Sequence, residues 1–283
     1  MTDRDDRAKP NQTDSISPFR MVKSFWRHRD LLWQLVQRQV KISYSGSFLG
    51  IFWALARPLL LLGVYTFVFG SIFRVRFYGA QSGGTIEFAL VLLVGLSIFT
   101  IFADMLGRSP ALIVGNANLV KKVVFPLDLL IVAELGAVLF HFALSMAVFL
   151  VFFALYRGGV PLAALVAPVI LIPFLGLTLG VAWFVSATAV FFRDIGQMTG
   201  ILISVLMFMC PIFFPISAVP EAVRGLISLN PISYYVETMR ELFFSGITPA
   251  PAELFVHYLI GFTVMWLGWA WFQVTRRGFA DVL

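Results

Sequence analysis

Long apolar stretches, separated by short polar segments, fill the chain after residue 45. A membrane-spanning helix needs about 20 consecutive, mostly apolar residues. The stretches that reach this length are residues 47–73, 88–107, 129–156, 167–192, 195–216 and 254–275. The pattern therefore predicts an all-α membrane protein with six transmembrane helices. Residues 158–166, which contain Pro161, are predicted to form a separate short element on the outer side.

A different periodicity precedes the first span. Between residues 22 and 41, apolar side chains fall on one face of a helical wheel and most cationic side chains on the opposite face. This pattern is typical of a helix that lies in the membrane interface. The sequence therefore predicts a disordered cytoplasmic tail (1–18), an amphipathic interface helix (19–45) and a six-span transmembrane domain (46–283). The interface helix continues into the first span without a loop.

Basic residues predict the orientation of these spans. Lys and Arg accumulate in the cytoplasmic segments of membrane proteins. Of the 21 in this chain, 15 lie in the N-terminal segment, in the loops after the second and fourth spans, and at the C-terminus. Both termini are therefore predicted to face the cytoplasm. The net charge of +6 is assigned to this topology and to anionic lipid headgroups, and not to nucleic acid.

Few residues of the chain are suited to catalysis or metal binding. It has one cysteine, Cys210, and three histidines far apart in sequence, so neither an intrachain disulfide nor a metal site is predicted. None of its five lysines follows a glycine, as the phosphate-binding loop of an ATPase requires. The chain is therefore predicted to be a transport protein without a cofactor of its own. An enzyme embedded in the membrane would need clustered carboxylates, histidines or cysteines.

Two segments on the predicted cytoplasmic side differ from simple connectors. In residues 108–125, the pair Ser109-Pro110 is typical of the start of a helix and Gly115-Asn116 of a break in it. This loop combines apolar and basic side chains, which a docking site for a cytoplasmic partner explains better than a solvated linker does. The turn at Arg193-Asp194 is interpreted either as a topology anchor or as a second, smaller contact.

Residues 217–246 lie on the predicted outer side. They are too amphipathic for a span and too apolar for a free loop. Asn230-Pro231 is expected to separate two short helices. This outer hairpin is either an interfacial element without a role or a gate over a translocation path, with Pro231, Tyr234 and Tyr235 as gate residues.

Ionisable and aromatic residues inside the spans allow more than one interpretation. Arg57, Asp104, Asp128 and Glu134 lie in or near spans, where charged groups are costly and often functional. These side chains either reach to the membrane interface or form an arginine–carboxylate pair inside the bundle. Such groups would also suit a proton-coupled carrier. Aromatic residues of the first and fifth spans are either packing residues or the lining of a path for a glycan. They are Phe48, Phe52, Trp53, Phe208, Phe213 and Phe214.

Several motifs, in their order and spacing, resemble the membrane subunits of ABC exporters in the polysaccharide-export branch. That branch includes O-antigen, capsule and teichoic acid permeases. The motifs are YSGSFLGIFWALARPLLLLGVYTFVFG (44–70), NANLVKKVVFP (116–126), FFRDIGQM (191–198), PIFFP (211–215) and LNPISYYVETMRELFFSG (229–246). Arg57, just before Pro58, departs from the neutral residue or Asn expected at that position.

This resemblance implies a homodimer with a channel between protomers and two copies of a separate ABC subunit that binds Mg-ATP. ATP-driven closure of that subunit would move the interface helix and the first and fifth spans, and a lipid-linked polysaccharide would pass through the channel. The expected ATPase-coupling residues are Arg27, Arg38, Leu112, Asn118, Leu119, Lys121, Lys122, Arg193 and Asp194. The expected channel residues are the six aromatic ones above and Arg57.

Two other functions are compatible with the sequence. A permease of the same architecture could export a drug or a small lipid, and a self-sufficient carrier could use an ion gradient in place of ATP. A channel too narrow for a hexose ring would exclude glycan export. Transport in the absence of an ATPase would identify the carrier.

Overall fold

The computed structural model describes residues 18–45, 50, 52–68, 85–122 and 125–283. Across these ranges the regular elements are helices, and the predicted all-α class is confirmed. The main ones are α1 (Pro18–Arg27), α2 (Arg29–Tyr44), α3 (Phe52–Tyr65), α4 (Thr85–Val114), α5 (Ala117–Lys122), α6 (Asp128–Arg157), α7 (Ala167–Phe191), α8 (Ile195–Phe208), α9 (Glu221–Ser228), α10 (Pro231–Arg240), α11 (Pro251–Thr275) and α12 (Phe279–Val282). Short turns of other helix types are η3 (Leu162–Val166), η4 (Ile216–Ala218), η5 (Glu241–Ser245) and η6 (Arg276–Gly278).

Some sequence predictions fall outside the described residues. The predicted tail, apart from Pro18, and the predicted channel residue Phe48 belong to this group. The side chains of Arg57 and Lys122 also lie outside the described part of the chain, although both residues belong to described helices.

Four helical segments within the described ranges are long and apolar enough to cross a membrane. They are Ile86–Val114, Asp128–Arg157, Leu162–Phe191 and Pro251–Val282. Two further apolar helices, over Phe52–Val68 and Ile195–Phe208, are shorter. The six predicted spans therefore correspond to four long helical segments and two short helices in the part of the chain that the structure describes.

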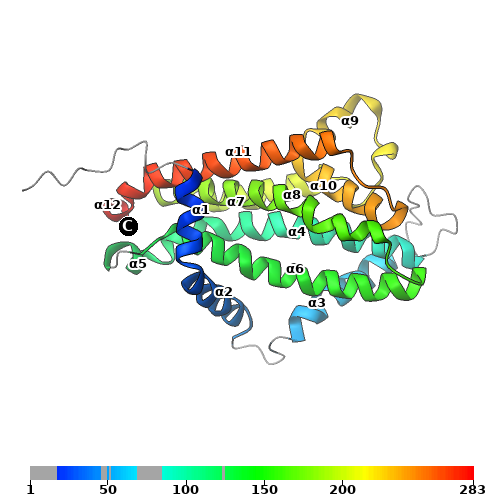
Figure 1. Cartoon of the computed structure of the whole chain (residues 1–283), viewed down its shortest axis with the longest axis horizontal. Coiled ribbons are helices and arrows are strands. Elements are labelled where there is room, and N and C mark those ends of the chain that lie inside the picture. The colour runs from blue at the N-terminus through cyan, green and yellow to red at the C-terminus, as the bar shows by residue number, and fades with distance from the viewer. Residues whose placement is uncertain (1–17, 46–49, 51, 69–84, 123–124) are drawn as a thin grey trace, which may run out of the picture.

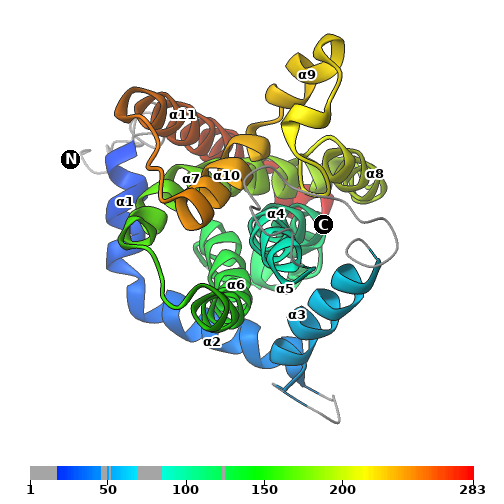
Figure 2. The ribbon, with the colours of Figure 1, turned by 90° about the vertical axis from the view of Figure 1, so that its right-hand side faces the viewer.

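The long helices α4, α6, α7 and α11 run along the long axis of the molecule, and α4 lies at their centre (Figures 1 and 2). The most apolar part of α4 is 78% buried, compared with 17–39% for the other three long segments. Helix α4 packs against α6 and α7 and also contacts α10, α8 and α3. The centre of the protomer is therefore a largely apolar helix enclosed by other helices, as the absence of charge from residues 88–103 requires.

The two ends of the bundle differ. Helices α5 and α12 and the turn between α7 and α8 lie at one end, which we call the basic end because Lys121, Arg193, Arg276 and Arg277 lie there. Helices α9 and α10 lie at the other, hairpin end (Figure 1). Helices α1 and α2 cross the long helices from the outside, in the half of the bundle toward the basic end (Figures 1 and 2).

Helices α7 and α11 pack with their backbones in direct contact. A Cβ atom at Gly268 of α11 would collide with the carbonyl of Gly180 in α7, and one at Gly261 would collide with the carbonyl of Pro173. Small residues allow such close approach between membrane helices, where packing replaces the hydrophobic effect as the force that holds helices together. Glycine at these positions is therefore a condition of this helix pair.

The structure corrects the predicted start of the loop helix at Ser109-Pro110. Helix α4 continues through both residues to Val114. The Ser109 hydroxyl donates to the Met105 carbonyl within the helix at 2.5 Å, so it does not cap a helix start. Because Leu112 and Ile113 are buried in the core, tertiary packing outweighs the local signal of Pro110. The predicted break at Gly115-Asn116 is confirmed, and the short helix that follows it is α5.

The structure contains the other short elements that local sequence patterns predicted. The predicted interface helix consists of two helices, α1 and α2, which meet at a turn at His28. The short element before the fourth span is η3. Asn230 separates α9 from α10, and its side-chain oxygen caps α10 by accepting from the Ile232 amide at 3.0 Å. This confirms the two short helices of the outer hairpin.

Candidate functional site

Most of the predicted coupling residues are exposed at or near the basic end. Their positions follow from the helices that hold them: α1 and α2 outside the bundle, α5 at its tip, and the turn between α7 and α8. The exposed ones are Arg27, Arg38, Asn118, Lys121, Arg193 and Asp194. We call this set of exposed polar residues, with cations from four separate elements, the basic surface.

Leu112 and Leu119 do not belong to this surface. Leu112 is buried in the core, and Leu119 is half-buried and packs against it. Helix α5, which contains Leu119, also contacts α12. The apolar side chains that suggested a docking loop therefore fix α4 and α5 to the bundle of this chain. In this loop the polar residues Asn118 and Lys121 are exposed, and among its larger apolar side chains Val114 is 40% exposed.

A buried ion pair links α4 to α6 in the half of the bundle toward the basic end. Arg108 Nη1 donates to Glu134 Oε1 at 2.8 Å, and Arg108 Nη2 lies 3.7 Å from Asp104 Oδ2. The side chain of Glu134 is 1% exposed, so this contact compensates a carboxylate that would otherwise be very costly to bury. The predicted internal arginine–carboxylate pair is confirmed for Glu134, with Arg108 as its partner.

Asp128 forms a second buried polar contact, between α6 and α11. Its Oδ2 atom accepts from Trp269 Nε1 and from Gln273 Nε2, both at 3.4 Å. Its backbone carbonyl accepts from Trp183 Nε1 at 3.3 Å. Asp128 therefore joins the start of α6 to α7 and α11, as a structural bond between three helices.

The interface helices contact the long helices through specific side chains. The ring of Phe25 in α1 stacks on Trp183 of α7, with centroids 5.9 Å apart and planes at 12°. Val36 of α2 packs so closely on Gly136 of α6 that a Cβ atom there would come within 2.5 Å of Val36 Cγ2. A displacement of α1 or α2 would therefore act directly on α7 and α6.

Arg240 of α10 anchors the hairpin end. This side chain is buried, and its guanidinium donates to the carbonyls of Val91 (3.2 Å), Ile212 (2.6 Å) and Pro211. The last two carbonyls belong to the non-helical segment that follows α8. Gly95 makes room for the guanidinium, because a Cβ atom there would lie 2.7 Å from Arg240 Nη2.

The predicted gate residues differ in their surroundings. Tyr235 is fully buried and packs on Phe174 of α7, with ring centroids 4.8 Å apart. Tyr234 is half-buried and stacks on His257 of α11, with centroids 3.4 Å apart. Pro231, at the start of α10, is exposed. Helix α10 is thus held against α7 and α11, whereas α9 projects away from the bundle (Figure 2).

The described channel residues lie on the two short apolar helices or in the segment that follows α8. Phe52 and Trp53 of α3 and Phe208 at the end of α8 are exposed. Phe213 and Phe214, in the segment after α8, are half-buried. The Tyr65 and Phe213 rings lie 6.0 Å apart, so the predicted first and fifth spans meet at the hairpin end.

Comparison with known proteins identifies the family. Residues 30–244 match the family described as ABC-2 type transporter, membrane part. This chain belongs to the ABC-2 type transporter family. The O-antigen export system permease protein RfbA of Klebsiella pneumoniae is 28% identical over 255 residues, or 90% of this chain and 95% of the relative. RfbA of Myxococcus xanthus is 27% identical over 93% of this chain and 98% of the relative. The polysialic acid transport protein KpsM of Escherichia coli is 26% identical over 82% and 88%.

These findings confirm the resemblance inferred from the motifs. The part of this ABC-2 type transporter that matches the family begins in α2 and ends in η5. It therefore contains the basic-surface residues of α5 and of the turn before α8, the short helices α3 and α8, and the outer hairpin.

Sequence reasoning missed three residues of this ABC-2 type transporter that join its parts. Trp183 and Gly136 receive the interface helices, and Arg240 was considered only as a topology marker on the outer side. A signal existed for Arg240, because it is the one cation of the amphipathic segment 229–246. For Trp183 and Gly136 there was none, since an apolar or small residue in a span is most often ordinary packing.

Proposed function

We propose that this ABC-2 type transporter is the permease subunit of an ATP-driven exporter that moves a lipid-linked polysaccharide across a bacterial inner membrane. The observation that carries the proposal is the similarity over nearly the whole chain to relatives named for O-antigen export and polysialic acid transport. The all-helical, apolar fold agrees with a permease that leaves ATP hydrolysis to a separate subunit.

The proposed topology has six spans, with both termini in the cytoplasm. Helices α4, α6, α7 and α11 supply four of them, and the segments that contain α3 and α8 supply the others. Helix α8 has 14 residues, about 21 Å at 1.5 Å per residue, which is too short for a hydrocarbon core of about 30 Å. The non-helical segment after it completes the span, because Arg240 satisfies its carbonyls in a place without water.

Two copies of the chain are proposed to form the channel between them. Helices α3 and α8 present large apolar side chains that the described part of the protomer leaves exposed, among them Phe52, Trp53 and Phe208. Arg57 belongs to the same helix as Phe52 and Trp53. Aromatic faces of this kind contact sugar rings without binding them tightly. The outer hairpin, with Tyr234, Tyr235 and Pro231, would close the outer end.

The basic surface is proposed to dock two copies of an ABC subunit that binds Mg-ATP. Its exposed residues on α5 and in the turn before α8 would make the contact. Closure of the ATPase pair would move α1 and α2, and the contacts of Phe25 with Trp183 and of Val36 with Gly136 would pass that movement to α7 and α6.

Deletion of the gene in its host, with complementation by this chain, tests the proposal. We expect the deletion to remove the surface polysaccharide and to leave a lipid-linked glycan inside the cell. Complementation should fail when the partner ATPase lacks its phosphate-binding lysine. Normal surface glycan together with new drug sensitivity would instead indicate drug export, and transport in vesicles without an ATPase would indicate an ion-coupled carrier.

Cysteine crosslinking in membranes tests the homodimer separately. Phe208 of α8 and Phe255 of α11 are 71% and 70% exposed, which makes them a matched pair. The only native cysteine, Cys210, is buried. We expect Phe208→Cys to form a crosslinked dimer and Phe255→Cys to stay monomeric. Equal crosslinking of both variants would contradict a dimer formed through α8.

A further inference from the structure

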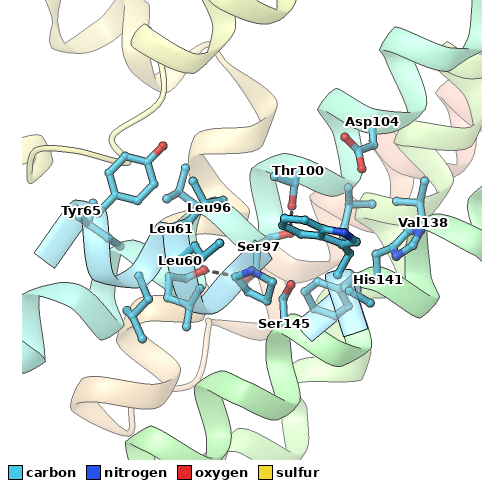
Figure 3. A pocket seen from close by; sticks show the side chains of 18 of the residues that line it. Leu60, Leu61, Tyr65, Leu96, Ser97, Thr100, Asp104, Val138, His141 and Ser145 are labelled. Carbon is cyan, nitrogen blue, oxygen red and sulfur yellow. Dashed lines mark hydrogen bonds between the residues drawn. The ribbon is translucent and has the colours of Figure 1, made fainter. Parts of the chain in front are cut away.

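A cavity of about 570 Å³ lies between α3, α4 and α6, with the end of α2 at one side (Figure 3). Its size is within the range of small-molecule sites. The lining residues of α4 extend from Ala89 to Arg108, about 28 Å along the helix at 1.5 Å per residue. The cavity is therefore long and narrow, and it runs along much of the depth of a membrane.

One half of the cavity is apolar and opens on the outside of the bundle. Its walls are Leu92, Leu93 and Leu96 of α4 and Leu60 and Leu61 of α3. Leu60 and Leu61 are 59% and 37% exposed, so they line the cavity and also face the surroundings of the protomer. In a membrane those surroundings are lipid chains, and a single chain can enter from the side.

The other half, toward the basic end, combines apolar side chains such as Ile101 and Val138 with the polar residues of the cavity. Ser97 and Thr100 follow the leucines along α4, and Asp104 and His141 lie beyond them (Figure 3). His141 Nδ1 and the Tyr44 hydroxyl are 2.5 Å apart, which connects α6 to the end of α2 at this site. The polarity of the cavity thus changes from hydrocarbon-like to hydrogen-bonding along its length, as the polarity of a lipid does.

The charged side chains in this half are Arg108 and Asp104, which form an ion pair with their nearest atoms 3.7 Å apart. Among the described residues, Arg108 donates one hydrogen bond, to Glu134, and it therefore keeps further N–H groups toward the cavity it lines. Asp104 also lines the cavity, accepts no hydrogen bond within the described residues and lies 3.7 Å from Arg108. One site thus offers a cation for a phosphate and a carboxylate for an ammonium group.

We propose that this cavity binds one aminophospholipid of the inner leaflet, such as phosphatidylethanolamine. Its phosphate accepts from Arg108, its ammonium group donates to Asp104, and one acyl chain lies between α3 and α4. A diphosphate or an anionic glycerol headgroup would bring negative charge beside Asp104 and Glu134 without a cation to compensate both. This lipid site goes beyond the proposed function, because lipid binding requires neither export nor the ATPase.

Lipid retention tests the proposal without a transport assay. The full chain is reconstituted in vesicles of equal parts phosphatidylethanolamine, phosphatidylcholine and phosphatidylglycerol, and then extracted in mild detergent. Mass spectrometry measures the lipid that stays bound to each chain. We expect a several-fold enrichment of phosphatidylethanolamine over both other lipids, because phosphatidylcholine has no N–H donor and phosphatidylglycerol has no ammonium group.

Two matched pairs of variants locate the site. Asp104→Asn should remove the enrichment, and Asp281→Asn, at an exposed position of α12, should keep it. Ser145→Phe fills the cavity and should lower the amount of retained lipid, and Ala143→Phe, on the exposed side of α6, should not. Melting curves of the variants identify any that do not fold.

Three results would overturn the proposal. The first is retained lipid with the composition of the vesicles, and the second is an enrichment that survives both Asp104→Asn and Ser145→Phe. The third is displacement of phosphatidylethanolamine by a polyprenyl-diphosphate glycan added to the vesicles, which would make the cavity a site for the exported substrate.

Discussion

The pair α7 and α11 and the pair α3 and α8 use glycine in opposite ways. In the first pair, Gly180 and Gly268 bring two backbones into contact, and no side chain fits between them. In the second pair, a Cβ atom at Gly63 of α3 or at Gly200 of α8 would meet open space. Both pairs are apolar. Hydrophobicity therefore does not decide whether an apolar helix is packed inside the protomer or left exposed on it. The shape of the helix surface decides, as expected in a membrane.

This difference divides the protomer into two parts. The first is a scaffold of tightly packed helices, and the second, which we call the available side, is formed by apolar helices that the protomer leaves exposed. Helices α4, α6, α7 and α11 hold most of the buried side chains, together with the ion pair of Arg108 and Glu134. Helices α3 and α8 carry exposed large apolar residues such as Phe52, Ile201 and Phe208. In the proposed exporter, the scaffold carries force from the interface helices, and the available side lines the channel and contacts the second copy.

The largest predicted effect belongs to the scaffold. Gly268→Val should prevent folding, because the new side chain would occupy the place of the Gly180 carbonyl and force α7 and α11 apart. We expect little monodisperse protein after detergent extraction, measured by size-exclusion chromatography with fluorescence detection. Gly200→Val on α8 is the matched control and should yield protein as the unmodified chain does. Normal folding of the Gly268 variant would show that the contact between these helices is not needed.

A smaller loss of stability is expected when Arg240 is replaced, because this residue connects the scaffold to the segment after α8. Arg240→Met leaves three carbonyls without their donor and should cost about 4.5 kcal/mol or more, because each hydrogen bond to a charged group contributes about 1.5–3 kcal/mol. Arg224→Met, which removes one hydrogen bond to the Val219 carbonyl, should cost about 1.5 kcal/mol. Thermal unfolding in detergent measures both. Equal losses in the two variants would contradict the anchoring role of Arg240.

Substitutions in the basic surface should weaken binding of the ATP-binding subunit and leave folding unchanged. The double variant Lys121→Glu and Arg193→Glu should lower the recovery of the ATP-binding subunit about tenfold, which corresponds to about 1.4 kcal/mol. Glu221→Lys, an exposed charge reversal at the hairpin end, is the control. The comparison is made by affinity purification of the tagged chain. Unchanged recovery of the ATPase would place its docking site elsewhere.

Leu112→Asp would not serve as a docking test. The sequence placed Leu112 among the expected coupling residues, because an apolar residue in a cytoplasmic loop is costly to expose. The structure shows that this residue is buried, so an aspartate there would destabilise the fold before it affected a partner. The same residue pattern thus supported a docking surface in the sequence and a packing contact in the structure.

The sequence predicted the parts of the fold that depend on local pattern. Long apolar runs identified α4, α6, α7 and α11, and Asn230-Pro231 placed the break between α9 and α10. It did not predict features that depend on partners far apart in the chain. Ser109-Pro110 looked like a helix start because the packing of Leu112 and Ile113, which keeps α4 intact, is invisible in a local window.

In the candidate site, too, the sequence predicted what depends on local pattern and missed what depends on residues far apart in the chain. Exposed polar residues such as Lys121 and Arg193 were found from charge and turn signals alone. Arg108 was counted as a topology marker, although it pairs with Glu134, 26 residues later. The cavity between α3, α4 and α6 has no local signature, since it is the space that three helices from different parts of the chain leave between them.

The smallest predicted effect gives the sharpest comparison of the two helix pairs. Gly180→Ala and Gly200→Ala add the same methyl group to two apolar helices. The first should lower the melting temperature, because its Cβ atom would collide with the Val264 carbonyl of α11. The second should leave stability unchanged or raise it by up to about 1 kcal/mol, since alanine favours a helix over glycine. If α8 also contacts the second copy, Gly200→Ala should change the crosslinking of Phe208→Cys without a loss of melting temperature. A loss as large as that of Gly180→Ala would mean that α8 is packed within the protomer, and the division into scaffold and available side would fail.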